Sequence, residues 1–235
     1  MKVSILIPAY NERKTLPEVL GRLSQLKGLD LEVVIADDAS TDGTPEWLGA
    51  QLPDIGWPVK IVRHEVNRGK GAAVVSAFRA SSGEIVVIQD ADLEYDPSYI
   101  ERLVAEIASG SAEVVYGSRL LTKGSVTHSR LYLCGNMFLT WIINRLCGSS
   151  MTDAYTGYKA FSRAVMASLG IESSGFEIEA EVSVKVAMRG FAYREVPIIY
   201  RARTRAAGKK IGWRDAVLGI WTILRTWWSE RRGRR

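Results

Sequence analysis

Three carboxylates stand at alternate positions directly after a short apolar run. The run covers residues 85–89, and the carboxylates are Asp90, Asp92 and Glu94. Side chains two residues apart in an extended chain point to the same side, and Mg²⁺ and Mn²⁺ accept carboxylate oxygens as ligands. The spacing therefore predicts a divalent metal site at the end of a strand, with Glu94 as a third oxygen donor. Helix capping and solvent-exposed acids are the alternative for so short a pattern.

Polar residues follow three earlier apolar runs as well. The runs are 3–7, 31–36 and 59–63, and the segments after them are 8–12 (PAYNE), 37–44 (DDASTDGT) and 67–71 (NRGKG). Each segment alone is compatible with an ordinary turn. The carboxyl ends of parallel strands, however, face one crevice in which ligands bind. We therefore expect the four segments to form one site, with acids for a sugar or base edge beside metal-binding acids and a basic loop.

Amphipathic helical patterns separate these apolar runs. β-Branched runs that alternate with such helices predict an α/β fold, in which a mostly parallel sheet is covered on both faces. We expect Pro8 to end the first strand and Thr44 to cap the helix that Pro45 begins. Asp96 is expected to cap the helix that Pro97 begins.

The second half of the chain does not continue the regular alternation of strand and helix patterns. The expected elements are a fifth strand at 113–116, a long apolar segment at 130–147, a short element near Ala160, a helix around 178–188, a strand at 193–199, a basic loop at 200–210 and a helix from about 213 to 229. The sequence contains no repeat and no low-complexity linker. We therefore predict one domain at 1–210 and a C-terminal segment at 211–235 that forms an amphipathic helix with a basic tail.

Charge divides the 235-residue chain unevenly. Residues 191–235 hold 12 of the 31 Lys and Arg but only 3 of the 26 Asp and Glu. The body is therefore acidic and the C-terminal part basic, although the formal net charge is only +5. Four of the seven Trp also lie in the last 23 residues. A basic, Trp-rich end predicts contact with an anionic surface, either a membrane or a nucleic acid.

The pattern of the C-terminal helix favours a membrane. Four arginines end the chain after a helical face formed by Trp213, Val217, Ile220, Trp221, Leu224, Trp227 and Trp228. Trp anchors beside a basic end are typical of a helix that lies in the membrane interface. Segment 130–147, which contains Trp141, is a second candidate. Packing of both helices on the sheet is the alternative, and we expect no segment to span a bilayer.

Other classes of site find less support. Cys134 and Cys147 form no CxxC pair, and with His64 and His128 they lack zinc-ligand spacing. The chain begins as a strand pattern without a signal-peptide profile. A nucleic-acid or dinucleotide binder is a further hypothesis, based on the basic tail and GKGAAV. That motif lacks the third glycine of a dinucleotide fingerprint and the Ser or Thr of a P-loop.

Four of the motifs occur together in a known order. VSILIPAYNE, ADDASTDGT, NRGKGAAV and IQDADLEYDP resemble the family 2 glycosyltransferases with a GT-A fold, a Rossmann-like, mostly parallel sheet with flanking helices that binds nucleotide-diphosphate sugars. Within that family the chain looks most like dolichyl-phosphate mannose synthases and related polyprenyl-phosphate sugar transferases. The resemblance covers residues 1 to about 161 and continues more loosely through GFEIEAEV and RARTRAAGKKIGW.

The resemblance implies a donor site in the crevice of the 1–210 domain. It implies that Asp90, Asp92 and Glu94 hold Mg²⁺ or Mn²⁺ at the diphosphate, with Asp90 and Asp92 as catalytic residues; the family often has Gln where Glu94 stands. The residues expected around the nucleotide sugar are Pro8, Tyr10, Asn11, Glu12, Asp37, Asp38, Lys70 and Gln89, with Arg201, Arg203 and Lys209 from the basic loop. That loop is expected to close over the diphosphate as a lid.

A lipid monophosphate fits the remaining cations as the acceptor. Its second pKa is about 6, so its oxygen is largely ionised at pH 7 and needs no general base. What it needs is cationic positioning, which Arg119, as a catalytic residue, and Arg130 are placed to supply. Asp153 resembles the acidic residue of the family near the acceptor, with a turn or helix cap as the alternative.

The expected function is transfer of a hexose to a polyprenyl or dolichyl monophosphate; the resemblance implies inversion at the anomeric carbon and favours GDP-mannose as the donor. We expect the protein to bind peripherally at the cytoplasmic face of a membrane and to bind no nucleic acid. Two alternatives keep the fold. One uses UDP-glucose as donor, and the other is a soluble glycosyltransferase with a hydroxyl acceptor and Asp153 as base.

Overall fold

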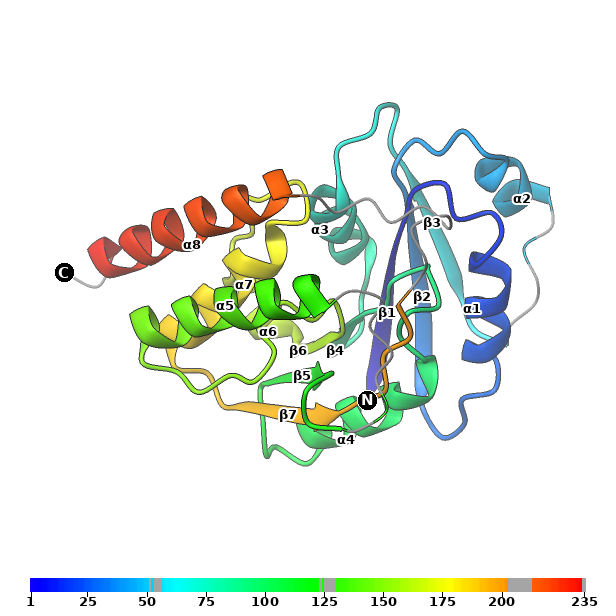
Figure 1. Cartoon of the computed structure of the whole chain (residues 1–235). Helices are drawn as coiled ribbons and strands as arrows, with labels where there is room; N and C mark the ends of the chain where they lie inside the picture. Colours follow the sequence, from blue (N-terminus) through cyan, green and yellow to red (C-terminus); the bar gives the residue numbers. More distant parts are fainter. Residues whose placement is uncertain (51, 53–55, 123, 125–129, 203–212, 234–235) are drawn as a thin grey trace.

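The computed structural model describes residues 1–50, 52, 56–122, 124, 130–202 and 213–233. Within these ranges seven strands form one sheet in the order β3-β2-β1-β4-β6-β5-β7 (Figure 1). β6 is antiparallel to β4 and β5, and the other neighbours are parallel. The strands are β1 (Lys2–Ala9), β2 (Asp30–Asp37), β3 (Val59–Arg63), β4 (Ile85–Ile88), β5 (Val114–Ser118), β6 (Lys159–Ser162) and β7 (Tyr193–Pro197). The expected mostly parallel α/β sheet is confirmed.

Helices cover both faces of the sheet (Figure 1). One face is covered by α1 (Leu16–Leu23), α2 (Thr44–Ala50) and α4 (Ile100–Ala108), which the short 3-10 helix η1 (Pro97–Tyr99) precedes. The other face is covered by α3 (Lys70–Ala80), α5 (Arg130–Cys147), α6 (Arg163–Ser168), α7 (Ile178–Arg189) and α8 (Trp213–Gly233).

The two helical layers meet opposite sides of the same strands. In β1, Ile5 and Ile7 pack against the first layer and Leu6 against the second, and all three are fully buried. Burying such a side chain stabilises a fold by roughly 1.5–3 kcal/mol. The two cores therefore fix the strands, and with them the places where the strands end.

The first strand passes through Pro8 instead of ending there, which corrects the expectation from sequence. The carbonyl of Leu6 accepts a hydrogen bond from the β4 side, and that of Ala9 accepts one from the β2 side. The backbone polar groups of successive residues point alternately to the two neighbouring strands. The backbone nitrogen of Pro8 therefore points, like that of Leu6, toward the β4 side. β4 ends at Ile88, which pairs with Leu6, so the missing N–H of Pro8 removes no hydrogen bond from the sheet.

One of the two expected helix caps is correct. Asp96 caps η1, since its carboxylate accepts from Ser98 N at 2.9 Å. Thr44, by contrast, is already the first residue of α2. Its N–H and its hydroxyl both donate to Asp42. The expected Thr44 cap is therefore wrong, because a carboxylate is a stronger acceptor than a hydroxyl and lies within reach.

The C-terminal helix α8 packs beside α5 and α7 (Figure 1). Trp227 Nε1 donates to the carbonyl of Leu146 at the end of α5. The buried side chains of α8, which face the rest of the protein, include two threonines: Thr222, Ile223 and Thr226 are buried. Ile220 and Trp227 are partly buried against the same core as Ile223. Five other large apolar residues of α8 are 41% to 58% exposed, namely Val217, Leu218, Trp221, Leu224 and Trp228. The helix is thus confirmed, and most of its large apolar side chains face away from the core.

Helix α5 also exposes large apolar side chains, namely Met137, Phe138 and Trp141. Phe138 and Trp141 stack on each other with their ring centroids 6.0 Å apart. None of the helices in the described part of the chain combines the length and the apolar character that crossing a bilayer requires.

Candidate active site

The carboxyl ends of β1, β2 and β4 lie side by side, and a strained residue follows each. Asn11, Ala39 and Leu93 have φ angles of 58°, 60° and 62°, and they are the non-glycine residues with positive φ in the described ranges. Such conformations cost on the order of 1 kcal/mol or more each and persist where surrounding contacts enforce them, often at functional sites. Pro8 and Tyr10, two of the predicted nucleotide residues, are half-buried at the same edge. This edge is the candidate site.

The loops after β1 and β2 are joined by hydrogen bonds. Asn11 N donates to Ser40 Oγ at 2.9 Å, and Asn11 Oδ1 accepts from Thr41 N at 2.7 Å. Glu12 Oε2 accepts from Thr15 Oγ1 at 2.7 Å just before α1 begins. The structure therefore places Asn11 and Glu12 at the edge as predicted, where their polar groups help to shape the loops.

Asp37 and Asp38 are both buried but make different contacts. Asp38 accepts from His64 Nδ1 at 2.6 Å and from the backbone N–H groups of residues 68 and 69 at 2.8 and 2.7 Å, so it holds the basic loop after β3. Asp37 Oδ1 accepts from Ser40 N at 3.1 Å. Its Oδ2 lies 3.5 Å from Arg63 Nε and accepts no hydrogen bond within the described residues. Of the two acids, Asp37 is the better placed to bind a ligand.

The glycines of the NRGKG motif serve close packing. A Cβ at Gly69 would lie 2.5 Å from the carbonyl oxygen of Ser174, and one at Gly71 would collide with that of Ser173. The same Ser174 carbonyl accepts a hydrogen bond from Ala72 N. The segment before α7 therefore rests on the first turn of α3, which explains both glycines without a dinucleotide at this helix.

Lys70 belongs to a chain of four largely buried charges that we call the carboxyl-end ion cluster (Asp90, Lys70, Glu179 and Lys159). Lys70 Nζ lies 2.8 and 2.9 Å from the two oxygens of Asp90 and 3.0 Å from Glu179 Oε1. Glu179 Oε2 pairs with Lys159 Nζ, whose side chain is completely buried. The cluster joins the turn after β4 to α3, α7 and β6.

Lys70 and Glu179, the central pair of this cluster, are kept charged by their neighbours. Burial lowers the pKa of Lys70, but the charges of Asp90 and Glu179 outweigh it and raise that pKa above its ordinary value. Burial raises the pKa of Glu179, but Lys159 and Lys70 outweigh it and lower that pKa. For Asp90, burial raises the pKa and the charge of Lys70 offsets only part of the effect.

The predicted metal ligands are close in sequence but do not converge as expected. β4 ends at Ile88, so Asp90, Asp92 and Glu94 lie in a turn rather than an extended strand, and their alternate spacing does not align them. Among the described residues, no three His, Cys, Asp or Glu side chains are grouped closely enough to hold a metal ion. Glu94 N donates to Asp92 Oδ1 at 3.1 Å.

The donor set of this turn nevertheless suits a divalent cation. Its side-chain donors are carboxylate oxygens, the ligands that Mg²⁺ and Mn²⁺ prefer. Asp90 already binds a cation with both oxygens, namely the ammonium of Lys70. The buried Gln89 donates to the carbonyls of Asp90 and Tyr95, both at 3.1 Å, and so supports the turn.

Arg119 and Asp153 form a bidentate ion pair. Arg119 Nε and Nη2 donate to the two oxygens of Asp153 at 2.6 and 2.7 Å, and the side chains are only 10% and 2% exposed. Glu195 accepts from Asp153 N at 3.1 Å, and the ring of Tyr200 lies 5.2 Å from the Arg119 guanidinium carbon. Two of the three predicted acceptor residues are thus brought together. The third, Arg130, begins α5, and its side chain is not among those described.

The segment after β7 crosses the acidic turn. Tyr95 and Tyr200 form an isolated bridge, Tyr200 Oη donates to Glu94 Oε2, and Arg201 N donates to the Glu94 carbonyl at 3.1 Å. Arg201 is therefore anchored by its backbone beside the predicted metal ligands, and its side chain is exposed. Arg203 and Lys209 lie outside the described residues.

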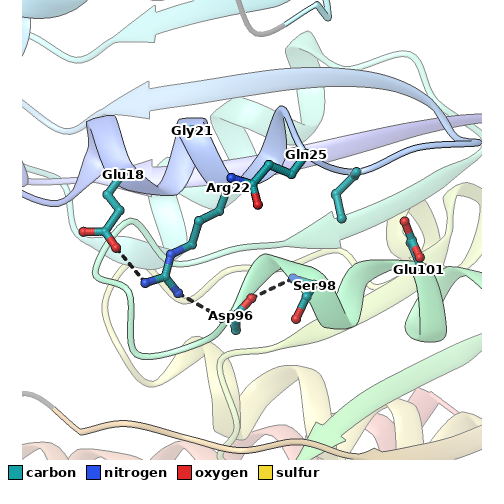
Figure 2. A pocket seen from close by; sticks show the side chains of 8 residues that line it. Glu18, Gly21, Arg22, Gln25, Asp96, Ser98 and Glu101 are labelled. Carbon is teal, nitrogen blue, oxygen red and sulfur yellow. Dashed lines mark hydrogen bonds and ion pairs between the residues drawn. The ribbon is translucent and has the colours of Figure 1, made fainter.

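A separate hollow lies between α1 and the start of α4 (Figure 2). Its volume is about 670 Å³. At one side Arg22 donates to both Glu18 and Asp96 (Figure 2). The hollow contains none of the predicted donor or acceptor residues, and Arg22, the cation among its lining residues, already pairs with two carboxylates. It is not the candidate site.

Reasoning from sequence missed three residues of the site: Lys159, Glu179 and Tyr200. A lysine at the start of a short apolar strand and a glutamate in the first turn of a helix are visible signals. Their roles depend on α7, α3 and β6 meeting in space, which no local pattern encodes. Tyr200 gave the weaker signal, as an aromatic residue next to a basic loop.

The chain is similar in sequence to a known protein family and to several named proteins. The family model described as glycosyl transferase family 2 matches residues 4–170. A dolichol-phosphate mannosyltransferase of Pyrococcus furiosus is 32% identical over 222 residues, which are 90% of this chain and 60% of the relative. An undecaprenyl-phosphate mannosyltransferase of Micrococcus luteus is 27% identical over 97% of this chain and 96% of its own length. A dolichyl-phosphate hexose transferase of Haloferax volcanii is 32% identical over 86% of this chain and 83% of its own.

The relatives differ in length from this chain. It spans 60% of the Pyrococcus furiosus protein and 37% of a second Haloferax volcanii glycosyltransferase. Among solved structures, glucosyl-3-phosphoglycerate synthase of Mycobacterium tuberculosis, crystallised with Mg²⁺ and UDP, superposes with a TM-score of 0.74 at 22% identity. The match covers 96% of this chain and 79% of that one, and it supports the GT-A fold.

Proposed function

The chain belongs to glycosyl transferase family 2, and on that premise we propose that it transfers a hexose from a nucleotide-diphosphate sugar to a polyprenyl monophosphate. In this reaction the acceptor phosphate oxygen attacks the anomeric carbon, the bond to the nucleotide diphosphate breaks, and the configuration of the sugar inverts. The favoured donor is GDP-mannose, because two of the relatives are named as polyprenyl-phosphate mannosyltransferases. UDP-glucose is the alternative donor.

The observation that carries the choice of acceptor is the Arg119–Asp153 ion pair. A hydroxyl acceptor needs a general base, and both oxygens of Asp153 already accept hydrogen bonds from Arg119. A phosphate monoester is largely ionised at pH 7 and needs no base. The pair also holds the guanidinium in one orientation, as planar recognition of a phosphate requires. These contacts favour a lipid phosphate over a hydroxyl acceptor.

The donor site comprises the strand ends and the turn after β4. Asp37, with one buried oxygen that accepts no hydrogen bond from the described residues, would bind the nucleoside. Asp90, Asp92 and Glu94 would hold Mg²⁺ or Mn²⁺, which neutralises charge on a diphosphate leaving group. Lys70 and Arg201 add positive charge beside these acids, with Arg203 and Lys209 following in the chain.

The proposed partner surface is the anionic, cytoplasmic face of a membrane, to which α5 and α8 would bind peripherally. The two helices contact each other, and both expose large apolar side chains, Trp141 and Trp221 among them. On α8, Arg225 lies 5.3 Å from the Trp221 ring and Arg232 lies 5.1 Å from the Trp228 ring. Apolar rings between cations match an interface in which acyl chains lie beneath anionic headgroups.

A transfer assay tests the reaction. The protein is incubated with radiolabelled GDP-mannose or UDP-glucose, Mg²⁺ or Mn²⁺, and vesicles that contain either a polyprenyl phosphate or the matching polyprenol. We expect label in the lipid fraction with the phosphate and not with the alcohol. Transfer to the alcohol, or to soluble sugars alone, would overturn the proposed acceptor.

Flotation of the same vesicles tests the membrane surface. We expect the wild-type protein to float with anionic phosphatidylglycerol vesicles, and Trp221→Glu with Trp228→Glu to lower the bound fraction by about tenfold. Ile61→Glu is the matched control, since Ile61 is 43% exposed on the edge strand β3, away from α5 and α8. Equal flotation of the double variant and the control would argue against this surface.

A further inference from the structure

Lys70 already binds both oxygens of the carboxylate that a metal ion at Asp90 would need. Its ammonium is within 2.9 Å of both Asp90 oxygens, and its side chain is only 12% exposed. A divalent ion on the same carboxylate would lie within a few ångströms of this ammonium, where like charges repel strongly. The contact between Lys70 and Asp90 and a metal on Asp90 therefore disfavour each other.

The surroundings of Lys70 fix its backbone and give its ammonium a second carboxylate partner. The first turn of α3 is held by the contact of Gly69 and Gly71 with the segment before α7. Glu179 is the second partner of Lys70, and it is itself held by the fully buried Lys159. If Lys70 leaves Asp90, Glu179 still retains its ammonium in the site.

We propose that Lys70 is the resident cation of Asp90 before the donor binds, that it gives up this carboxylate to a divalent metal, and that Glu179 then keeps its ammonium beside the diphosphate. Lys70 thus neutralises Asp90 in one state and an anionic substrate in the other. Glu179 is a positioning residue that acts through Lys70. The inference rests on the donor site of the proposed function.

Titration with Mn²⁺ alone tests the exchange. Free Mn²⁺ is counted by electron paramagnetic resonance at pH 8, without nucleotide, on the full chain. We expect Lys70→Met to bind Mn²⁺ about tenfold or more tighter than the wild type, because a competing charge has been removed. The same variant should bind GDP or UDP more weakly in the presence of Mn²⁺. Unchanged or weaker Mn²⁺ binding by folded Lys70→Met would overturn the proposal.

A matched control lies on the same helix as Glu179. Lys185 also pairs with a carboxylate of α7, Glu181, but within the described residues it makes no contact with Asp90. Lys185→Met should therefore bind Mn²⁺ like the wild type. A gain equal to that of Lys70→Met would attribute the effect to general loss of positive charge and overturn the proposal.

A measurement on the wild-type protein keeps the test independent of folding in the variants. Acetylation by acetic anhydride, read by mass spectrometry, reports how accessible each lysine amine is. Mn²⁺ without nucleotide should increase acetylation of Lys70 severalfold relative to Lys185. Equal acetylation with and without bound Mn²⁺ would overturn the exchange even if the transfer assay succeeds. Increased acetylation together with a failed transfer assay would support the exchange and reject the proposed reaction.

Discussion

The two ends of the central sheet both bury charge, and they do so in different ways. At the amino end, Glu32 of β2 is fully buried and accepts from Ser4 Oγ at 2.7 Å and Gly83 N at 3.2 Å. Lys2 and Lys60 lie 2.8 and 3.3 Å from its second oxygen. At the carboxyl end, acids and lysines alternate in the carboxyl-end ion cluster, and Asp37 keeps a buried oxygen that accepts no hydrogen bond from the described residues.

The contrast indicates which buried charges hold the fold and which are available for a ligand. The buried Glu32 is surrounded by donors, so a further cation has no role there. The backbone at the carboxyl end is strained at Asn11, Ala39 and Leu93, whereas no non-glycine residue near Glu32 in the described ranges has a positive φ. Strain and incomplete hydrogen bonding at the carboxyl end support the proposal that substrates bind there.

The largest effect on transfer is expected from Asp92→Asn at the carboxyl end. Loss of one carboxylate beside the diphosphate should lower kcat/KM by about 100-fold or more. Because Asp92 is only half-buried, we expect the free energy of unfolding to change by less than about 1 kcal/mol. Rates of nucleotide release and urea unfolding measure the two quantities.

Asp96→Asn is the matched control for this change. Asp96 is four residues further on and caps η1, so its loss should affect stability more than transfer. Wild-type kcat/KM in Asp92→Asn would remove this residue from the proposed metal site and weaken the contrast between the two ends.

A smaller effect is expected from Arg119→Lys, also on the carboxyl side. Lysine keeps the charge but loses the planar fork that donates to both oxygens of Asp153. The KM for the lipid phosphate should rise by about tenfold, while the KM for the donor stays the same. Initial rates at varied acceptor and donor concentrations separate the two constants.

Arg163→Lys is the control from the amino side of the sheet. Arg163 Nη2 donates to Ser81 Oγ, and its backbone N–H donates to the Glu84 carbonyl next to β4. Its replacement should leave both Michaelis constants unchanged. A donor KM that rises together with the acceptor KM in Arg119→Lys would show that the pair supports the whole site rather than the acceptor.

Much of the fold was predictable because its signals are local. The alternation of apolar runs and amphipathic helices predicted the sheet, and the segment 130–147 coincides with α5. β6 was expected only as a short element, because four residues carry too little pattern to show that the strand is antiparallel and inserts between β4 and β5. The apolar face of α8 was visible, but its packing side was not, since Thr222 and Thr226 face the core by virtue of small size.

The candidate site was predictable in its location and less so in its contacts. Strand ends converge by general rule, so Asp37, Asp38 and Asp90 could be assigned to one edge. Which acid remains available depends on partners far away in sequence: Asp38 is taken by the loop after β3, and Asp90 by Lys70. Glu179 enters only because α7 packs near α3, a contact that no short-range pattern contains.

The smallest effect on transfer, and a large one on stability, is expected from Glu32→Gln at the amino end. Burial raises the pKa of the Glu32 carboxyl, but hydrogen bonds from Lys2, Ser4 and Ser82 outweigh it and hold that pKa well below its ordinary value. A lowered pKa in the folded state stabilises the protein above the ordinary glutamate pKa of about 4.3, and this stabilisation is lost as the pH falls below that value. Glu32→Gln should therefore lower the free energy of unfolding by about 3 kcal/mol at pH 7 and by less at pH 3. Urea unfolding at both pH values measures this difference in stability, with Glu46→Gln on the exposed side of α2 as control.

Glu32 is remote from the carboxyl ends of the strands, so kcat and both Michaelis constants of folded Glu32→Gln should equal those of the wild type. A loss of transfer in the fully folded variant would mean that the two ends of the sheet are coupled. The division between structural charge at one end and reactive charge at the other would then fail.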